Sequence, residues 1–127
     1  MARNLLEGNR HTPNYSGIPS VVFTTPPLVR VGLLEEAARV QGLRFTTHHE
    51  DTSSWYSSRR VALPHTGFKT LVEEGTGRVL GAHLLGPHAE EVINLFALAI
   101  RMGLRASELK HMIYTYPTSA SDVNYML

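Results

Sequence analysis

The stretch that decides the fold is residues 68–102, FKTLVEEGTGRVLGAHLLGPHAEEVINLFALAIRM. Its first half contains two strand-like arms, Phe68–Glu74 and Arg78–Leu85. The Gly75-Thr76-Gly77 segment between them supplies residues that adopt the positive φ of a tight turn without a steric penalty. The pattern therefore predicts an antiparallel β-hairpin.

The second half of this stretch predicts the longest helix of the chain, from about Ala89 to Met102. Pro87 lies just before its first turn, and Gly103 follows its last turn, where a helix commonly ends. Glu90 and Glu91 lie in the first turn, where the helix dipole stabilises carboxylates. The order hairpin then helix indicates a helix packed on a sheet.

This helix is more apolar than a surface helix of a small monomer needs to be. Between Val92 and Met102 only Asn94 and Arg101 are polar. A helix that is apolar nearly all round needs cover on more than one side, and one sheet covers a single side. Either loops and other helices cover the remainder, or a symmetric partner subunit does. The second interpretation assigns the partner contact to four residues: Val92, Phe96, Ala99 and Ile100.

Weaker signals predict the remaining elements. We expect a strand over residues 21–25 ended by two prolines, a short helix over 33–40, a strand over 43–47, a short helix over 107–112 and a last helix from about 119. Residues 48–60 are polar, and we expect a surface segment anchored by Trp55 and Tyr56. The resulting order predicts an α+β fold, an antiparallel sheet with helices packed on one face.

The first 19 residues differ from the rest. Leu5-Leu6 resembles the end of a helix with Gly8 as its stop, and residues 9–19 are rich in Gly, Pro, Asn and Ser, which is typical of a linker. We therefore expect the folded domain to occupy residues 20–127.

The composition excludes several classes of function. Hydrophobic residues make up 43% and charged residues 18% of the 127 residues, which is typical of a globular domain. The net charge of +1 comes from scattered side chains and predicts binding to neither nucleic acid nor a membrane surface. The sequence has no cysteine, so thiolate catalysis and thiolate metal sites are excluded. With no secretory signal visible, we expect a cytoplasmic location.

Two local patterns could suggest a ligand but favour a plainer interpretation. Residues 48–51, His-His-Glu-Asp, could suggest a metal site, but adjacent histidines point to opposite sides and do not easily share one ion. We expect a solvated polar segment and no metal site. Arg59-Arg60 beside Trp55-Tyr56 could stack on a nucleic acid base, but no other basic cluster supports such a surface.

Four motifs in order resemble the interface domain of the pyridine nucleotide–disulfide oxidoreductases, which include glutathione reductases, dihydrolipoamide dehydrogenases and mercuric reductases. They are Ser20–Pro27 running into Val31-Gly32-Leu33, the strand Val79–Gly86, the helix Glu90–Gly103 and the segment Tyr116–Asp122. The last one stands where the family has His-Pro-Thr-x-x-Glu. The resemblance covers residue 20 to the C-terminus and implies that residues 1–19 are the end of an FAD-binding domain and its linker.

The resemblance implies that the chain is the homodimerisation domain of an FAD- and NAD(P)H-dependent oxidoreductase. It implies that the domain contacts the FAD domain of the partner chain, with Phe23, Thr24 and Pro117 near the cofactor. This chain itself has no G-x-G-x-x-G fingerprint and no cysteine pair, so we expect it to bind no cofactor and to be inactive alone. A free-standing dimeric adaptor domain without catalysis is the alternative.

One motif departs from the family pattern. The positions of the family's catalytic His and Glu hold Tyr116 and Ser121. A phenol titrates near pH 10, so Tyr116 is a poor general base but a competent hydrogen-bond donor. The departure argues against glutathione reductase or lipoamide chemistry and favours a parent that reduces metal ions or small electrophiles.

Two questions about this segment stay open. Tyr116 either faces the partner's flavin or simply packs before Pro117. Asp122 either replaces the missing carboxylate or stabilises the N-terminal end of the last helix. The resemblance also implies a cis bond between Tyr116 and Pro117.

Overall fold

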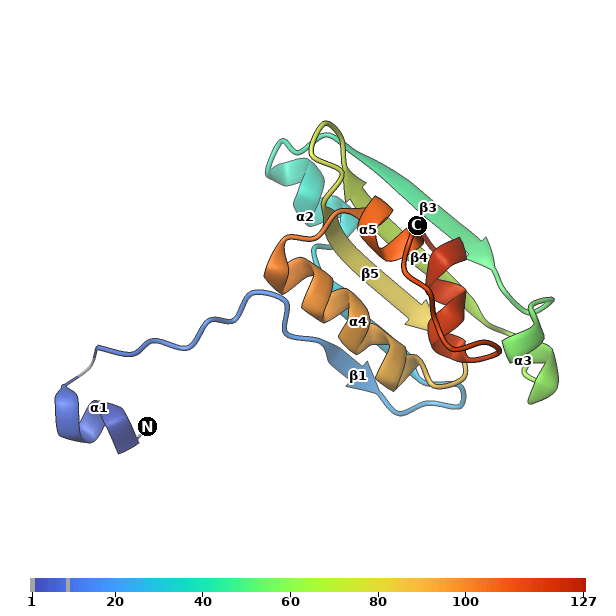
Figure 1. Cartoon of the computed structure of the whole chain (residues 1–127), viewed down its shortest axis with the longest axis horizontal. Helices are drawn as coiled ribbons and strands as arrows, with labels where there is room; N and C mark the ends of the chain where they lie inside the picture. The colour runs from blue at the N-terminus through green and yellow to red at the C-terminus, as the bar shows by residue number, and fades with distance from the viewer. Residues whose placement is uncertain (1, 9) are drawn as a thin grey trace.

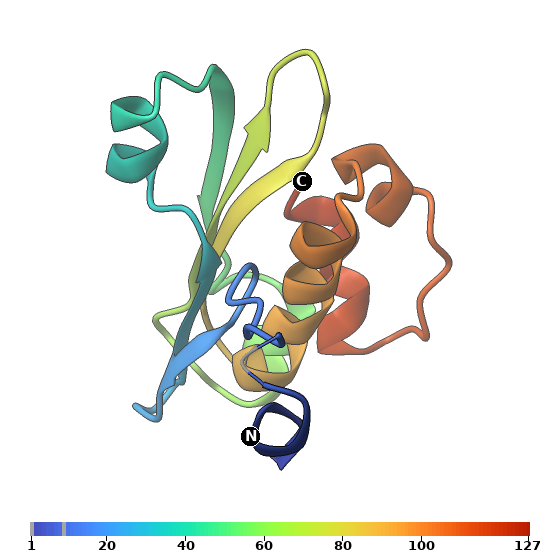
Figure 2. The same cartoon turned by 90° about the vertical axis from the view of Figure 1, so that its left-hand side faces the viewer.

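The structure, a computed structural model, describes residues 2–8 and 10–127. Five antiparallel strands form one sheet in the order β1-β2-β5-β4-β3 (Figure 1). The longest helix and the C-terminal helices cover one face, and one short helix lies on the other (Figure 2). The α+β class and the antiparallel sheet are as predicted.

The elements have the following bounds. The strands are β1 (Ser20–Val22), β2 (Leu28–Gly32), β3 (Phe45–Asp51), β4 (Gly67–Glu73) and β5 (Val79–Leu85). The helices are α1 (Ala2–Glu7), α2 (Glu35–Val40), α3 (Tyr56–Arg60), α4 (Ala89–Met102), α5 (Ala106–Lys110) and the 3-10 helix η1 (Ser119–Tyr125).

Residues 68–102, from which the fold was predicted, form β4, β5 and α4 at the centre of the domain. Strands β4 and β5 pair as the expected hairpin, and Gly75 and Gly77 in its turn have φ of 85° and 71°. Helix α4 runs over the predicted residues and ends at Gly103, which has φ of 66°. Its inner face packs on β2 and β5, with Phe96 wholly buried. This packing forms the hydrophobic core.

Strand β2 was not predicted. The two prolines at 26 and 27 do not end the sheet; they lie in the turn between β1 and β2, which pair antiparallel. In β2 the side chains of Val29 and Val31 alternate toward the core and are 2% and 1% exposed. The prolines lie between the strands, where no ladder hydrogen bond requires their N–H.

The polar segment after residue 47 is also more ordered than predicted. Strand β3 continues to Asp51 along the edge of the sheet, where its side chains are mostly exposed and polarity is tolerated. Helix α3 follows it and was not predicted. Trp55 anchors the segment, with its ring 5.7 Å from that of Phe68. Tyr56 stays exposed and does not act as an anchor.

An ion-pair cluster joins α2 to the outer face of the sheet. Lys69 on β4 and Arg39 on α2 each lie 2.6 Å from a carboxylate oxygen of Glu35. The hydrogen bonds from Lys69 and then Arg39 hold the pKa of Glu35 at about 2. These groups are partly exposed to solvent, so the cluster positions α2 more than it stabilises the fold.

The backbones of β2 and β5 approach each other closely where Gly32 pairs with Gly81. Gly32 and Gly81 face each other across the two strands. A Cβ on Gly81 would stand 2.2 Å from the carbonyl oxygen of Leu33, and one on Gly32 would stand 2.3 Å from that of Leu80. The Leu33 N–H also donates to the Leu80 carbonyl at 2.9 Å. Only glycine fits at both positions.

The segment before β1 extends away from the sheet. Helix α1 lies at the end of an extended stretch, apart from the body of the domain (Figure 1). The assignment of residues 1–19 to a preceding domain and linker stays a prediction. None of the helices in the described ranges is both long enough and apolar enough to cross a bilayer.

The Gly81→Ala variant should lose about 2 kcal/mol or more of unfolding free energy, because its methyl group would overlap a backbone oxygen that cannot move aside. Urea denaturation measures this loss. The control is Gly86→Ala, whose Cβ would meet Thr66 at an ordinary 3.8 Å. Equal stability of the two variants would contradict the importance of this close backbone approach.

Candidate functional site

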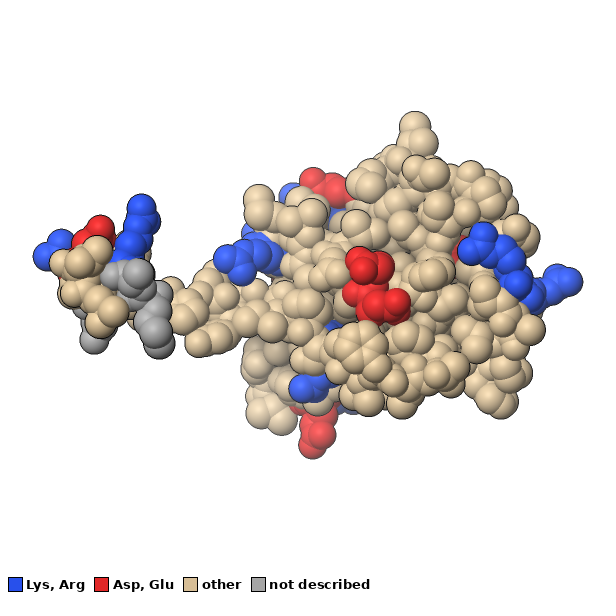
Figure 3. Space-filling model, turned by 90° about the horizontal axis from the view of Figure 1, so that it is seen from below, with Lys and Arg blue, Asp and Glu red and all other residues tan. Residues whose placement is uncertain are grey.

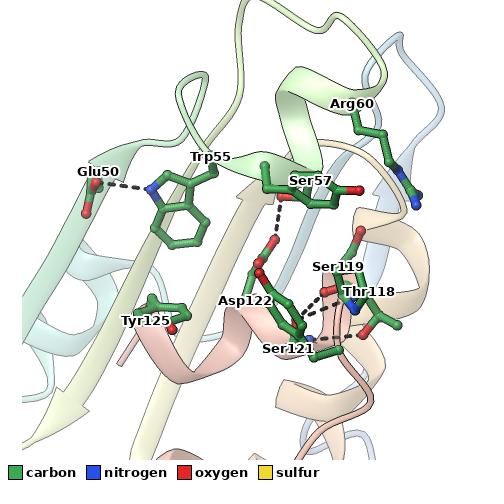
Figure 4. A pocket seen from close by; sticks show the side chains of 12 residues that line it. Glu50, Trp55, Ser57, Arg60, Thr118, Ser119, Ser121, Asp122 and Tyr125 are labelled. Carbon is green, nitrogen blue, oxygen red and sulfur yellow. Dashed lines mark hydrogen bonds between the residues drawn. The ribbon is translucent and has the colours of Figure 1, made fainter.

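A hollow of about 410 Å³ opens between α3 and η1 (Figure 4). Two segments far apart in the sequence meet there, one around α3 and one from Tyr116 through η1. The side chains that line it are Glu50, Trp55, Tyr56, Ser57, Arg60, Tyr116, Pro117, Thr118, Ser119, Ser121, Asp122 and Tyr125.

One hydrogen bond joins the two segments directly. The Ser57 hydroxyl donates to the Asp122 carboxylate at 2.5 Å. Asp122 is half-buried, and burial raises the pKa of its carboxyl above the ordinary value of 3.8, although the Ser57 bond opposes the shift. The carboxylate faces α3 and the hollow, where it accepts the hydrogen bond from Ser57 (Figure 4).

Ser121 is occupied by the backbone of its own helix. Its N–H donates to the Thr118 hydroxyl at 3.3 Å, and its own hydroxyl donates to the Thr118 carbonyl at 2.6 Å. This reciprocal cap makes Thr118 the N-cap of the last helix. Ser121 is 7% exposed, so its hydroxyl serves the cap. A catalytic role for Ser121 stays a prediction that this geometry does not support.

Tyr116 projects from the domain. Its side chain is 77% exposed, so it does not fill the core. Its bond to Pro117 is cis, as the resemblance implied. Because the side chain is exposed, the phenol is accessible to a second molecule, as a role in a partner's site requires. That role itself stays a prediction.

Trp55 forms the rigid wall of the hollow. Its indole N–H donates to a Glu50 carboxylate oxygen at 3.2 Å. Its ring also meets Tyr125 edge to face, with centroids 6.0 Å apart. The sequence drew attention to Trp55 as an anchor but gave no sign that it would line a site with residues from the C-terminal helix.

The predicted cofactor-contact residues do not come together. Phe23 and Thr24 lie in the turn between β1 and β2, where Phe23 is 79% exposed and the Thr24 hydroxyl donates to the Pro26 carbonyl at 2.7 Å. Pro117 lines the hollow beside α3 instead. Contact of these residues with a cofactor stays a prediction.

The structure changes which side chains of α4 a partner could meet. Val92, Phe96 and Ala99 are 5%, 0% and 1% exposed because they fill the space over the sheet. They have no surface to offer a second copy, and Ile100 is half-buried near Gly32. The exposed apolar residues of α4 are instead Leu98 and Met102, at 56% and 67%. Cover for the helix thus comes largely from its own domain.

The described residues hold no group of three or more His, Asp or Glu side chains arranged to bind a metal ion. The polar stretch at 48–51 lies on β3, and His48 is stacked edge to face on Phe68 at 5.0 Å. Its arrangement is that of an edge strand.

Comparison with known proteins identifies the family. The family model described as "Pyridine nucleotide-disulphide oxidoreductase, dimerisation domain" matches residues 18–127. The chain belongs to this family. The resemblance inferred from the sequence motifs is thereby confirmed.

Two curated relatives match this chain over most or all of its length. The chain is 42% identical over 127 residues to a 19.7 kDa uncharacterized protein in a mercuric resistance operon of Staphylococcus aureus, covering all of this chain and 71% of that protein. It is 34% identical over 118 residues to RclA, a probable pyridine nucleotide-disulfide oxidoreductase of Escherichia coli, covering 93% of this chain and 27% of RclA. The chain thus spans about a quarter of RclA.

Solved structures agree on the fold. The HOCl-induced flavoprotein disulfide reductase RclA from Escherichia coli superposes with a TM-score of 0.88 at 31% identity, over 98% of this chain and 29% of that one. LpdA from Mycobacterium tuberculosis superposes with a TM-score of 0.84 at 19% identity, over 98% of this chain and 27% of that one, and supports the fold alone.

The raised pKa of Asp122 predicts a pH-dependent effect of replacing it. Burial favours the neutral carboxyl in the folded state, so folding stability falls as pH rises from 3.8 toward the folded pKa. Because the Asn side chain does not titrate and can still accept from Ser57, Asp122→Asn should gain stability relative to the parent sequence as pH rises from 3 to 7.

Thermal unfolding at several pH values measures this trend. Asp51→Asn is the matched control, because the hydrogen bonds from Ser53 lower the pKa of Asp51 and predict the opposite sign. If the stability of Asp122→Asn and that of the parent sequence changed in parallel with pH, burial would not raise the pKa of Asp122.

Proposed function

We propose that this chain pairs with a second copy of itself as the homodimerisation domain of an FAD- and NAD(P)H-dependent oxidoreductase. The match of a dimerisation-domain family to residues 18–127 carries this proposal. The domain holds no cofactor fingerprint of its own, so its contribution to such an enzyme is pairing and the side chains that it presents to the partner.

The apolar surface of the helical layer supports pairing. Five of its exposed large apolar side chains, which we name the apolar ridge, are Leu98, Met102, Met112, Ile113 and Tyr116. The segment between α5 and η1 that carries three of them is the outermost part of this layer (Figure 2). Contiguous exposed apolar surface on a soluble domain marks an interaction site.

The position of the ridge follows from the packing of α4. Leu98 and Met102 lie one turn apart, on the side of the helix away from the sheet. Leu95, three residues before Leu98, lines a hollow with Pro117 and Thr118, so the segment after α5 runs beside this side of α4. The view from below, which does not look directly onto the helical layer, shows small separate groups of charged residues among uncharged ones (Figure 3).

Tyr116 gives the domain a means of acting on the partner. In the proposed parent its phenol would face the flavin and substrate held by the partner's FAD domain, where it would donate a hydrogen bond. The accessible phenol and the absence of the family's His–Glu pair support a parent that reduces a metal ion or a small electrophile. The 42% identical relative is a protein in a mercuric resistance operon.

A free-standing dimeric adaptor is the second candidate. It is favoured by that same relative, whose mass is 19.7 kDa and of which this chain spans 71%. Such a protein would pair through the apolar ridge without any flavin chemistry. Both candidates require self-association, and only the first requires Tyr116 to affect turnover.

The chain should sediment with about twice its 14.1 kDa mass at micromolar concentration. Leu98→Asp should weaken the dimer at least about tenfold, because the pairing would bury an unpaired charge. Sedimentation equilibrium measures both. Val40→Asp is the control, since Val40 is 84% exposed on α2, on the other face of the sheet. If the parent sequence were monomeric, or if Val40→Asp weakened the dimer as much as Leu98→Asp, pairing through the apolar ridge would be contradicted.

In a full-length reductase that carries this domain, Tyr116→Phe should lower kcat by about tenfold or more and leave the dimer intact, because only one hydrogen bond is removed. Steady-state kinetics and sedimentation together test this. Unchanged turnover would mean that Tyr116 is a surface residue without a catalytic part.

A further inference from the structure

The hollow between α3 and η1 contains aromatic and acidic groups that, apart from Tyr116, the proposed pairing does not use. Its apolar lining comes largely from four aromatic residues on two separate segments of the chain: Trp55 and Tyr56 on one, and Tyr116 and Tyr125 on the other. Aromatic faces carry negative charge density and attract cations, and tryptophan does so most strongly. The Trp55 ring is fixed by Glu50, Phe68 and Tyr125 and does not need to be ordered by a ligand.

Two carboxylates line the same hollow. Glu50 uses one oxygen to accept the Trp55 N–H, and Asp122 accepts the Ser57 hydroxyl. In the described part of the chain, neither carboxylate forms an ion pair with Lys or Arg. Burial of Asp122 raises the pKa of its carboxyl because desolvation disfavours the charged form, and the Ser57 hydrogen bond offsets only part of this effect. A cation in the hollow would supply that compensation.

The one cationic side chain of the lining stands apart from this end. Arg60 extends from α3 at the opposite side of the hollow from Glu50, with Trp55 and Asp122 between them (Figure 4). The region bounded by Glu50, Trp55, Asp122 and Tyr125 is therefore aromatic and acidic.

We propose that this hollow binds a small organic cation, an amine or quaternary ammonium compound. Its charged nitrogen would face the rings of Trp55 and Tyr125 on one side and the carboxylates of Glu50 and Asp122 on the other. The hollow of about 410 Å³ is within the size range of small-molecule sites. The joint between α3 and η1 through Ser57 holds both halves of the site in one monomer, so binding does not depend on the proposed pairing.

Other ligand classes fit the same groups less well. An anion would face two carboxylates, and Arg60 alone would offset them. A bare metal ion needs several closely converging ligands, and the described residues offer no such group at this position. An organic cation uses the rings and the carboxylates together.

The probe is benzyltrimethylammonium, titrated into the full 127-residue chain. Trp55 is the only tryptophan in the sequence, so its fluorescence reports directly on this hollow. We expect a saturable change with a Kd below about 10 mM, and binding at least about tenfold weaker for the neutral benzyl alcohol and the anionic benzoate.

Variants identify the groups responsible. Glu50→Gln keeps the acceptor for Trp55, Asp122→Asn keeps the acceptor for Ser57, and each should raise the Kd about tenfold by removing a charge. Arg60→Gln should lower the Kd, and Glu74→Gln, a charge change in the turn between β4 and β5, should leave it unchanged. Thermal unfolding checks that each variant is folded.

Three results would overturn the proposal: no saturable fluorescence change with the cation, equal or tighter binding of benzoate, or affinity unaffected by both carboxylate variants. Sedimentation of the same samples separates this outcome from the proposed pairing. A monomer that binds the cation supports the site and contradicts the pairing, and a dimer that does not bind it does the reverse.

Discussion

The close approach of the β2 and β5 backbones at Gly32 and Gly81 is the constraint on which the rest of the structure depends. Side chains at these positions would stand within 2.3 Å of backbone oxygens, so β2 and β5 could not pair in this register. That register sets Val31 beside Ala82 on the inner face, where α4 packs. The seating of α4 in turn decides which of its side chains remain exposed. The surface proposed for pairing thus follows from the close approach of β2 and β5.

The sequence predicted the elements whose signals are local. The hairpin and the bounds of α4 both depend on residues a few positions apart, and both are found. The β2 strand was missed because the prolines before it read as an end, although they form a turn between paired strands. The extension of β3 was missed because an edge strand is held by backbone hydrogen bonds, which polar side chains do not reveal.

Contacts between distant segments could not be predicted from local patterns. The bond from Ser57 to Asp122 joins residues 65 positions apart, and both residues line the hollow beside Trp55. Likewise, the pattern showed that α4 is highly apolar but not which side faces the sheet, so Phe96 was assigned to a partner although it fills the core. The family resemblance supplied the C-terminal motif, whereas the hollow beside it follows from the three-dimensional arrangement alone.

The central claim is that two copies of this chain meet through side chains that α4 leaves exposed and not through those that it buries. Isotope-filtered NMR on a mixture of differently labelled chains tests this claim most directly, because it detects contacts between copies residue by residue. We expect intermolecular contacts from the side chains of Leu98 and Met102 and none from Phe96. Intermolecular contacts confined to the other face of the sheet, or none at concentrations where the chain is fully folded, would contradict it.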